Sequence, residues 1–189
     1  ERYCIATDHR TGLLFEQMLV DPGLTDDEKV QCALELYYGD SVPRNIEDAL
    51  EALLWFYRCG APKPPQPRRS SRNQGGSGRP ERILDYAYDA PYIYAAFLAQ
   101  YGVDLNAQNN LHWWKFSAML DGLKEDQVIC KIMSYRALNL RDIKDKDERA
   151  RYRRLKARYA LPNTAAIAKK KAIAETLFMQ HEEGANEDS

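Results

Sequence analysis

The stretch LHWWKFSAMLDGL at residues 111–123 constrains the fold most, because it holds three large aromatic residues within four positions. At 3.6 residues per helical turn, Trp113 and Phe116 share one face, while Trp114 lies on the opposite face. Each such side chain can bury about 150–250 Å². A small domain cannot easily leave that surface in water, so we predict a central core helix with neighbours on two sides. A surface platform for stacked bases is disfavoured, and His112 is expected to pack or cap locally.

The rest of the sequence also reads as helices with recognisable ends. Thr25 with Glu28 forms a capping box, and glycines such as Gly39 and Gly102 follow the last apolar residues of their segments. The expected helix starts are Thr25, Asn45, Asp89, Asn106 and Asp145. We therefore predict an all-α fold, a compact helical bundle of about seven to eight helices. The predicted helices fall within residues 11–20, 25–40, 43–60, 89–102, 106–122, 125–140, 145–162 and 163–184.

A basic segment interrupts this pattern at residues 61–82. It contains five Pro, three Gly and three Ser, and six of its residues are Lys or Arg against one acid. Almost nothing apolar is present to bury, which is typical of a long flexible linker. We predict an N-terminal acidic helical subdomain (1–60), the linker (61–82), a helical core subdomain (83–162), and a C-terminal helix with an acidic tail (163–189).

Several classes of function find no support in the sequence. No nucleophile elbow, phosphate loop, zinc-protease motif or dinucleotide fingerprint occurs, so we expect no enzyme, no cofactor and no metal site. The four cysteines form no C-x-x-C pair and are expected to be reduced core thiols in a cytoplasmic protein. No run of about 18 apolar residues occurs, so no membrane partner is expected.

One tryptophan has the character of an interface anchor. In the helix expected near residues 45–58, most apolar residues share one face, and Trp55 projects to the other side among Asp48, Glu51 and Arg58. A large aromatic residue ringed by charge is typical of a binding hot spot. The alternative is that another helix of the same chain covers it, and the sequence leaves both open.

The helix expected after residue 145 is strongly basic. Arg149, Arg151, Arg153 and Arg154 surround a narrow stripe of Tyr152, Leu155 and Tyr159. Such a helix can dock by its stripe and leave its arginines in water or against acidic partners. It can also lie along nucleic-acid phosphates, although no base-reading motif accompanies it. We favour the solvated or acid-docking role.

Arg136 has an unusual position for a charged residue. Arg136 falls on an apolar face, where it can snorkel or pair with a carboxylate such as Asp121 or Asp85.

The charge is unevenly spread along the chain. Residues 1–60 hold twelve acids against five Lys or Arg, while residues 149–158 hold six Lys or Arg and no acid. Surfaces of opposite sign suit self-association or docking, and also packing within one chain.

The order of several segments resembles the small bacteriophage family known as gene product fifteen, from long-tailed phages. The segments are LTDDEKVQCALELYYGD, IEDALEALLWFYRCG, YIYAAFLAQYGVDL, LHWWKFSAMLDGL, KIMSYRALNLRDIKDKD and RYRRLKARYALP. The resemblance covers roughly residues 5–162 and is interrupted by the linker. It offers no catalytic residues, and the linker and the tail after Pro162 depart from the family pattern.

The resemblance implies a non-catalytic protein of phage tail morphogenesis, encoded near the tape-measure gene. Its neighbourhood is like that of tail assembly chaperones, which coat the tape-measure protein in the host cytoplasm and are absent from the mature virion. The implied partners are the tape-measure protein, the tail tube protein and further copies of this chain. The alternatives are a nucleic-acid-associated phage protein using residues 63–82 and 141–158, and a structural tail or connector component.

Overall fold

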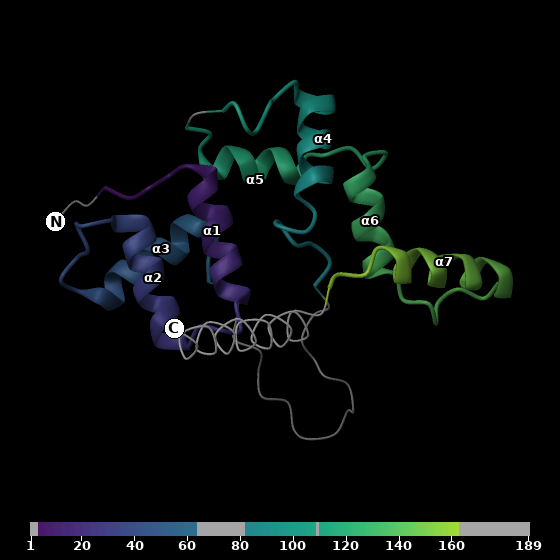
Figure 1. Cartoon of the computed structure of the whole chain (residues 1–189), viewed down its shortest axis with the longest axis horizontal. Helices are drawn as coiled ribbons and strands as arrows, with labels where there is room; N and C mark the ends of the chain where they lie inside the picture. Colours follow the sequence, from purple (N-terminus) through teal and green to yellow (C-terminus); the bar gives the residue numbers. More distant parts are fainter. Residues whose placement is uncertain (1–3, 64–81, 109, 163–189) are drawn as a thin grey trace, which may run out of the picture.

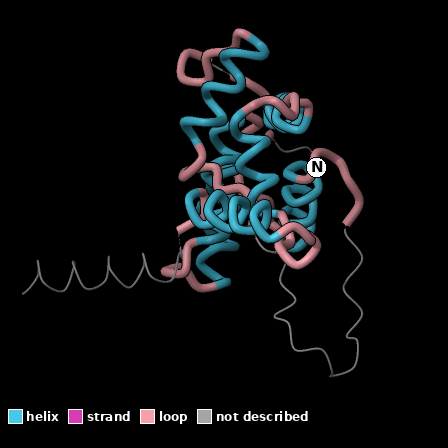
Figure 2. The backbone as a smooth tube through the Cα atoms, turned by 90° about the vertical axis from the view of Figure 1, so that its right-hand side faces the viewer, coloured by secondary structure: helices cyan, strands magenta, loops and turns pink. Residues whose placement is uncertain are grey.

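The computed structural model describes residues 4–63, 82–108 and 110–162, which form seven helices (Figure 1). The prediction of an all-α fold is confirmed for these residues, whose backbone is helix and loop throughout (Figure 2). The predicted linker, apart from its ends, and the predicted C-terminal helix and tail lie outside the described residues. The helices are α1 (His9–Val20), α2 (Asp26–Tyr38), α3 (Ile46–Tyr57), α4 (Ala90–Tyr101), α5 (Trp113–Asp121), α6 (Val128–Ala137) and α7 (Lys146–Arg158).

The helices contact one another in a chain of neighbours. α1 packs against α2 and α5, α2 against α3, α4 against α5 and α6, and α6 against α7. In Figure 1, α1, α2 and α3 gather at one end of the molecule, and α7 projects from the other. Six helices place a fully buried side chain in one hydrophobic cluster: Phe15, Tyr37, Leu53, Phe97, Phe116 and Ile129. The helices before and after residues 61–82 therefore share a core, to which α7 contributes no buried residue.

Local capping sets most of the helix starts as predicted. Thr25 and Glu28 form both halves of a capping box, and the side chains of Asn45 and Asp145 each accept a backbone N–H of their helix. The predicted start at Asn106 is wrong. The Asp104 carboxylate accepts the Asn106 N–H at 2.9 Å and holds a turn there, so α5 begins only after His112.

The start of α5 is pinned to the segment before α1. An isolated antiparallel bridge pairs Asp8 with His112. The Trp113 N–H, which has no partner within its own helix, donates to the Thr7 carbonyl at 2.8 Å. His112 caps the helix, since its Nδ1 accepts the Trp114 N–H at 3.2 Å. The expectation that His112 caps or packs locally is thus confirmed.

The paired tryptophans join α5 to the end of α3, and we call these contacts the aromatic joint. The indole Nε1 of Trp113 donates to the Tyr57 carbonyl and that of Trp114 to the Phe56 carbonyl, each at 2.7 Å. Carbonyls in the last turn of a helix lack partners within the helix, so the two indoles complete that end of α3. Trp113 is buried and stacks on Tyr57 with ring centroids 5.5 Å apart. The prediction of a core helix is confirmed.

Trp113 also requires a glycine on α1. A Cβ placed on Gly12 would lie 2.2 Å from the nearest atom of the Trp113 ring. The indole therefore rests directly on the backbone of α1, and no larger residue fits at position 12 without a shift.

Arg136 makes a second junction, which we call the ionic joint. Its guanidinium donates to both carboxylate oxygens of Asp89, at 2.6 and 2.8 Å, and both side chains are buried. It also donates to the carbonyls of Ile83 and Tyr159, at 2.9 and 2.6 Å. One side chain thus ties together the segment before α4, α6 and the end of α7.

The structure differs from two predictions, on the partner of Arg136 and on the burial of the cysteines. Arg136 pairs with a carboxylate, as one alternative held, but the partner is Asp89 and not Asp121 or Asp85. None of the four cysteines is fully buried: Cys4 and Cys59 are exposed, and Cys32 and Cys130 are half-buried, with Cys130 packed against the hydrophobic cluster. Within the described ranges, no helix is both long enough and apolar enough to span a bilayer.

Candidate partner-binding groove

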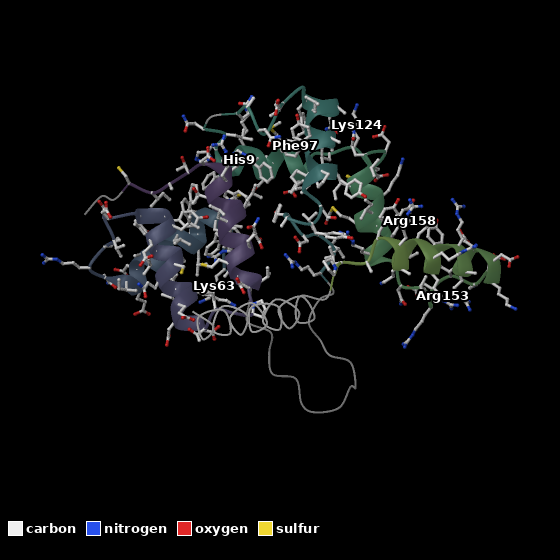
Figure 3. All side chains as sticks on the ribbon, viewed as in Figure 1. His9, Lys63, Phe97, Lys124, Arg153 and Arg158 are labelled. Atoms are coloured by element: carbon white, nitrogen blue, oxygen red, sulfur yellow. The ribbon has the colours of Figure 1, made fainter. Side chains whose placement is uncertain are left out.

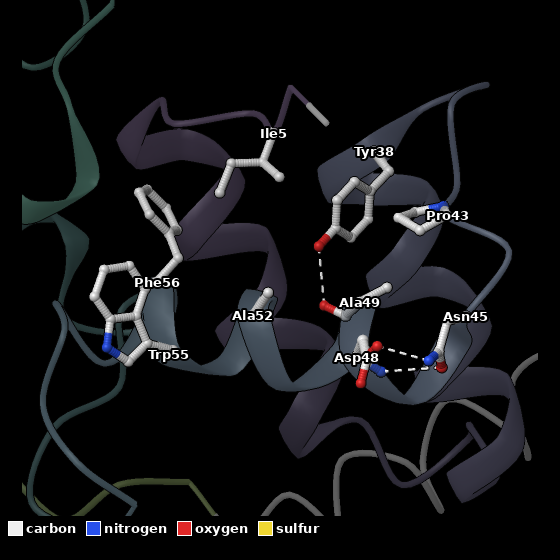
Figure 4. Close-up of a pocket in the computed structure, with 9 residues that line it drawn as sticks. All are labelled: Ile5, Tyr38, Pro43, Asn45, Asp48, Ala49, Ala52, Trp55 and Phe56. Atoms are coloured by element: carbon white, nitrogen blue, oxygen red, sulfur yellow. Dashed lines mark hydrogen bonds between the residues drawn. The ribbon is translucent and has the colours of Figure 1, made fainter. Parts of the chain in front are cut away.

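An apolar groove runs along α3 beside Trp55 (Figure 4). Its volume is about 490 Å³, and it is open to solvent. Its walls come from the segment before α1, the end of α2, the loop before α3 and α3 itself. The lining residues are Ile5, Tyr38, Pro43, Asn45, Asp48, Ala49, Ala52, Trp55 and Phe56.

The groove exists because α3 presents small side chains between larger walls. Ala49 and Ala52 form the part of α3 that lies between Asp48 and Trp55 (Figure 4). Opposite them, the Tyr38 hydroxyl donates to the Ala49 carbonyl at 2.9 Å, which fixes the tyrosine ring as a wall. From Asp48 to Trp55 is about 10 Å along the helix axis at 1.5 Å per residue. The groove is therefore about two helical turns long.

Trp55 forms one end of the groove and is 50% exposed. Its ring packs edge-on against Trp114, with centroids 5.6 Å apart. Behind it, Cys59 and Gly60 both have positive φ, and a Cβ on Gly60 would lie 3.3 Å from Trp114 and 3.4 Å from Trp55. The turn after α3 therefore lets both rings approach the backbone, and Trp114 packs against the ring of Trp55.

A polar group forms the other end of the groove. The Asn45 Nδ2 donates to the Asp48 carboxylate at 2.6 Å, and both residues are exposed (Figure 4). Glu51 is exposed on α3 but does not line the groove, and Arg58 turns away to donate to the Ala61 carbonyl at 3.4 Å. Of Trp55 and the three charged residues predicted around it, only Trp55 and Asp48 line this groove. Their role in binding stays a prediction.

The basic helix lies away from this groove, on α7. Arg149 is engaged within its own chain, where its guanidinium donates to the Ile143 carbonyl. Arg151, Arg153 and Arg154 are exposed. The predicted apolar stripe docks on α6, because Tyr152 and Tyr159 both contact the ring of Tyr135. The other arginines of α7 are presented to solvent, and Arg153 and Arg158 lie on different sides of the helix (Figure 3).

A second hollow, of about 260 Å³, lies beside His9 and is lined by residues of α1, α4 and α5 and of the segments around them. His9 is buried and stacks on Phe116 with centroids 5.4 Å apart, and its Nδ1 lies 3.3 Å from the Asp8 carboxylate. Burial lowers the pKa of His9 below 6.5, against the opposing effect of Asp8. This histidine is neutral near pH 7 and serves packing.

Near α1, burial also favours the neutral form of one carboxyl group and two tyrosine hydroxyl groups. Burial raises the pKa of Glu16, whose carboxylate accepts the Tyr57 hydroxyl, and raises that of Tyr86 to about 12. Burial likewise raises the pKa of Tyr37. No three His, Cys, Asp or Glu side chains cluster for a metal ion in the part of the chain described. What the groove offers is apolar surface with one acidic end, which suits binding.

Three walls of the groove were not predicted from the sequence: Ile5, Tyr38 and Pro43. They come from segments up to fifty residues from Trp55, and only their packing brings them to α3. A usable signal was present in α3 itself, where Ala49, Ala52 and Trp55 recur every third residue beside Asp48. Small residues at helical spacing next to an outward tryptophan are typical of a shallow groove.

Comparison with known proteins gives one match. The family model described as "Bacteriophage Gp15 protein" matches residues 1–161. Neither the curated proteins nor the solved structures gave a significant match.

Proposed function

Because this chain belongs to the Bacteriophage Gp15 protein family, we propose that it acts in phage tail morphogenesis as a chaperone that binds the tape-measure protein. The part of the chain matched by the family model includes every helix described above. The proposed activity is reversible binding, without chemistry on the partner. The observation that carries it is the half-exposed Trp55 at the end of an apolar groove.

The groove fits one face of an amphipathic helix. A groove two turns long accepts two apolar side chains spaced three or four residues apart, which is how such helices anchor. Asp48 at one end favours a Lys or Arg beside those anchors. A tape-measure protein, taken as a very long helix with apolar stripes, offers that pattern many times and would aggregate if left uncovered.

The magnitudes favour several copies on one partner. Burying one large apolar side chain contributes about 1.5–3 kcal/mol, so two anchors supply about 3–6 kcal/mol. The loss of translational and rotational freedom, at about 4–15 kcal/mol, offsets most or all of this gain. A single groove therefore binds weakly, and stable coverage comes from many sites along one chain. Weak individual contacts also allow the coat to be removed when the tail tube forms.

Co-expression with the tape-measure protein of the same phage tests the proposal. We expect the two to co-purify and the soluble fraction of the tape-measure protein to rise. Ala52→Phe, which fills the groove from an exposed position, should weaken both effects, whereas Ala150→Phe on exposed α7 should not. No co-purification and no gain in solubility with the wild-type chain would contradict the proposal.

The exposed arginines of α7 support a second candidate, binding to nucleic acid. Phosphate contacts from Lys and Arg give affinity that falls steeply with salt. A salt-dependent mobility shift of DNA or RNA, lost on neutralising Arg149, Arg151, Arg153 and Arg154 together, would favour this function. A structural role in the tail or connector is the third candidate, and detection of the chain in purified virions would favour it.

A further inference from the structure

One face of α7 carries an arginine stripe that makes no ion pair within the described part of the chain. Arg151, Arg154 and Arg158 recur at i, i+3 and i+7, so they share one face, and all three are exposed. Within the described residues, no ion pair forms between these arginines and an acid. Arg153 projects to the opposite side of α7 from Arg158 (Figure 3). We call Arg151, Arg154 and Arg158 the basic stripe.

The outward side of α3 carries residues at the same spacing. Asp48, Glu51 and Trp55 also recur at i, i+3 and i+7, and all three are exposed. Neither acid has an ion-pair partner in the described part of the chain. We call these three residues the acceptor stripe.

The two stripes do not meet within one molecule. α7 packs against α6, while α3 packs against α2 and lies in the group of helices at the other end (Figure 1). A contact between the stripes must therefore join two molecules.

We propose that the basic stripe of one copy docks along the acceptor stripe of a second copy. With the two helices parallel, Arg151 meets Asp48, Arg154 meets Glu51, and Arg158 lies over the ring of Trp55. The last contact is a cation–π pair, for which Trp is the best acceptor. Arg158 already lies 5.5 Å from the ring centroid of Tyr159, so its guanidinium is placed beside one aromatic ring.

The chemistry favours another copy of this chain over a phosphate backbone. The acceptor stripe matches the spacing of the basic stripe and supplies two carboxylates and an aromatic ring, a combination that a phosphate backbone does not present. Each copy offers one stripe of each kind at different ends, so the contact is heterologous and can repeat from copy to copy. The pairs lie near the surface, so the association is weak and salt-sensitive.

This association also bears on the groove, although it does not rest on the proposed function. Trp55 and Asp48 belong both to the acceptor stripe and to the lining of the groove. A docked α7 therefore covers one side of the groove, and self-association competes with any partner that binds there. Free copies would keep their apolar surface shielded by one another.

Sedimentation equilibrium of the full chain tests the proposal. At low salt we expect a mass that grows with concentration beyond the dimer. At about 1 M salt, where the screening length is about 3 Å, the association should weaken at least about tenfold. Wild-type chain that stays monomeric at low salt, or association that salt leaves unchanged, would overturn the proposal.

Matched neutral variants locate the contact without disturbing buried groups. Arg151→Gln with Arg154→Gln, or Asp48→Asn with Glu51→Gln, should each leave a monomer. The controls remove the same charge elsewhere: Lys146→Gln with Arg153→Gln on another side of α7, and Glu125→Gln with Asp126→Asn before α6, all exposed. The controls should associate as the wild type does, and equal loss in the controls would show general electrostatics and refute the stripes.

Mixing the two stripe variants gives the sharpest result. The arginine variant retains an intact acceptor stripe, and the acid variant retains an intact basic stripe. Together they should form a one-to-one dimer that does not grow. Iodide should quench Trp55 less in that mixture than in either variant alone. A mixture that stays monomeric, or arginines of α7 that shift nucleic acid while the chain never self-associates, would contradict the proposal.

Discussion

The aromatic joint and the ionic joint both satisfy polar groups inside the fold, but with different chemistry. At the aromatic joint, two neutral indole N–H groups meet two carbonyls of α3, surrounded by stacked rings. At the ionic joint, Arg136 meets Asp89 with both charges removed from water. The first lies between helices that share the hydrophobic cluster. The second anchors α7, which has no buried residue of its own.

The two joints should respond differently to the loss of one partner. Burial of Trp113 alone contributes about 4–6 kcal/mol as an upper bound, so the aromatic joint has apolar support that survives loss of one hydrogen bond. A buried ion pair has little surplus, because the cost of removing two charges from water offsets most of their attraction. Removing one partner then leaves a buried charge without compensation. The end that carries α7 should therefore be the more sensitive to the loss of a single polar partner.

Breaking the ionic joint should have the largest effect. Arg136→Met leaves the Asp89 carboxylate buried and unpaired, so the free energy of unfolding should fall by about 3–5 kcal/mol. Amide exchange in α7 should accelerate as well, because the Tyr159 carbonyl loses its donor. Arg141→Met, at an exposed position, is the control. Urea unfolding and hydrogen exchange measure both effects, and a loss below about 1 kcal/mol would mean that the pair is not buried in solution.

Overpacking the aromatic joint should come next. Gly12→Ala places a Cβ against the indole of Trp113, which must move, so unfolding should become easier by about 1–3 kcal/mol. Thr11→Ala, one residue earlier on α1, should change stability by less than about 0.5 kcal/mol. Denaturant midpoints compare the two variants, and equal small effects would show that Trp113 does not rest on α1.

Removing one indole hydrogen bond should cost less. Trp114→Phe keeps an aromatic ring but loses the donor to the Phe56 carbonyl, which still accepts the Cys59 N–H at 2.9 Å. The expected loss is about 0.5–1.5 kcal/mol. Because Trp114 also supports one edge of Trp55, the emission of Trp55 should become easier to quench. A loss comparable to that of Arg136→Met would remove the contrast between the joints.

The smallest effect should come from pH, through His9. Its pKa is lower in the folded chain than in the unfolded chain, so below pH 6.5 the unfolded chain takes up a proton that the folded chain does not. Stability is therefore lost as pH falls below 6.5. His9→Phe should flatten this dependence in thermal unfolding. The pKa of Glu16 is raised in the folded chain, so its contribution to stability falls as pH rises above 4.5, opposite in direction to that of His9. If His9→Phe left the dependence of stability on pH unchanged below 6.5, the assignment to His9 would be contradicted.

The parts of the fold that local chemistry controls were predictable. Thr25, Asn45 and Asp145 start their helices because each cap acts within a few residues of itself. The spacing of Trp113, Trp114 and Phe116 predicted a buried helix because the amount of apolar surface left no alternative. The predicted helix start at Asn106 was wrong because the Asp104 carboxylate accepts the backbone N–H groups of Asn106 and Ala107 and forms a turn. Capping preferences do not say which of two nearby Asp or Asn residues caps a helix and which forms a turn.

Long-range choices were not predictable. Asp89 read as a helix cap, and nothing in the sequence says that its carboxylate turns inward to Arg136 rather than to its own helix. The groove combines segments that begin with Ile5 and end with Phe56, so α3 indicated only one of its walls. The sequence left open whether Trp55 is exposed or covered by another helix. In the structure Trp55 is about half exposed, because the ring of Trp114 packs against it.

The most direct measurement is the affinity of the purified chain for the tape-measure protein, compared between Trp55→Ala and Leu98→Ala. Both remove a large side chain that is about half exposed, but Leu98 lies on α4 outside the groove. A binding hot spot contributes about 2 kcal/mol or more, so Trp55→Ala should weaken binding about 30-fold or more. Leu98→Ala should leave the affinity unchanged. Equal affinities for the wild-type chain and Trp55→Ala would contradict the account.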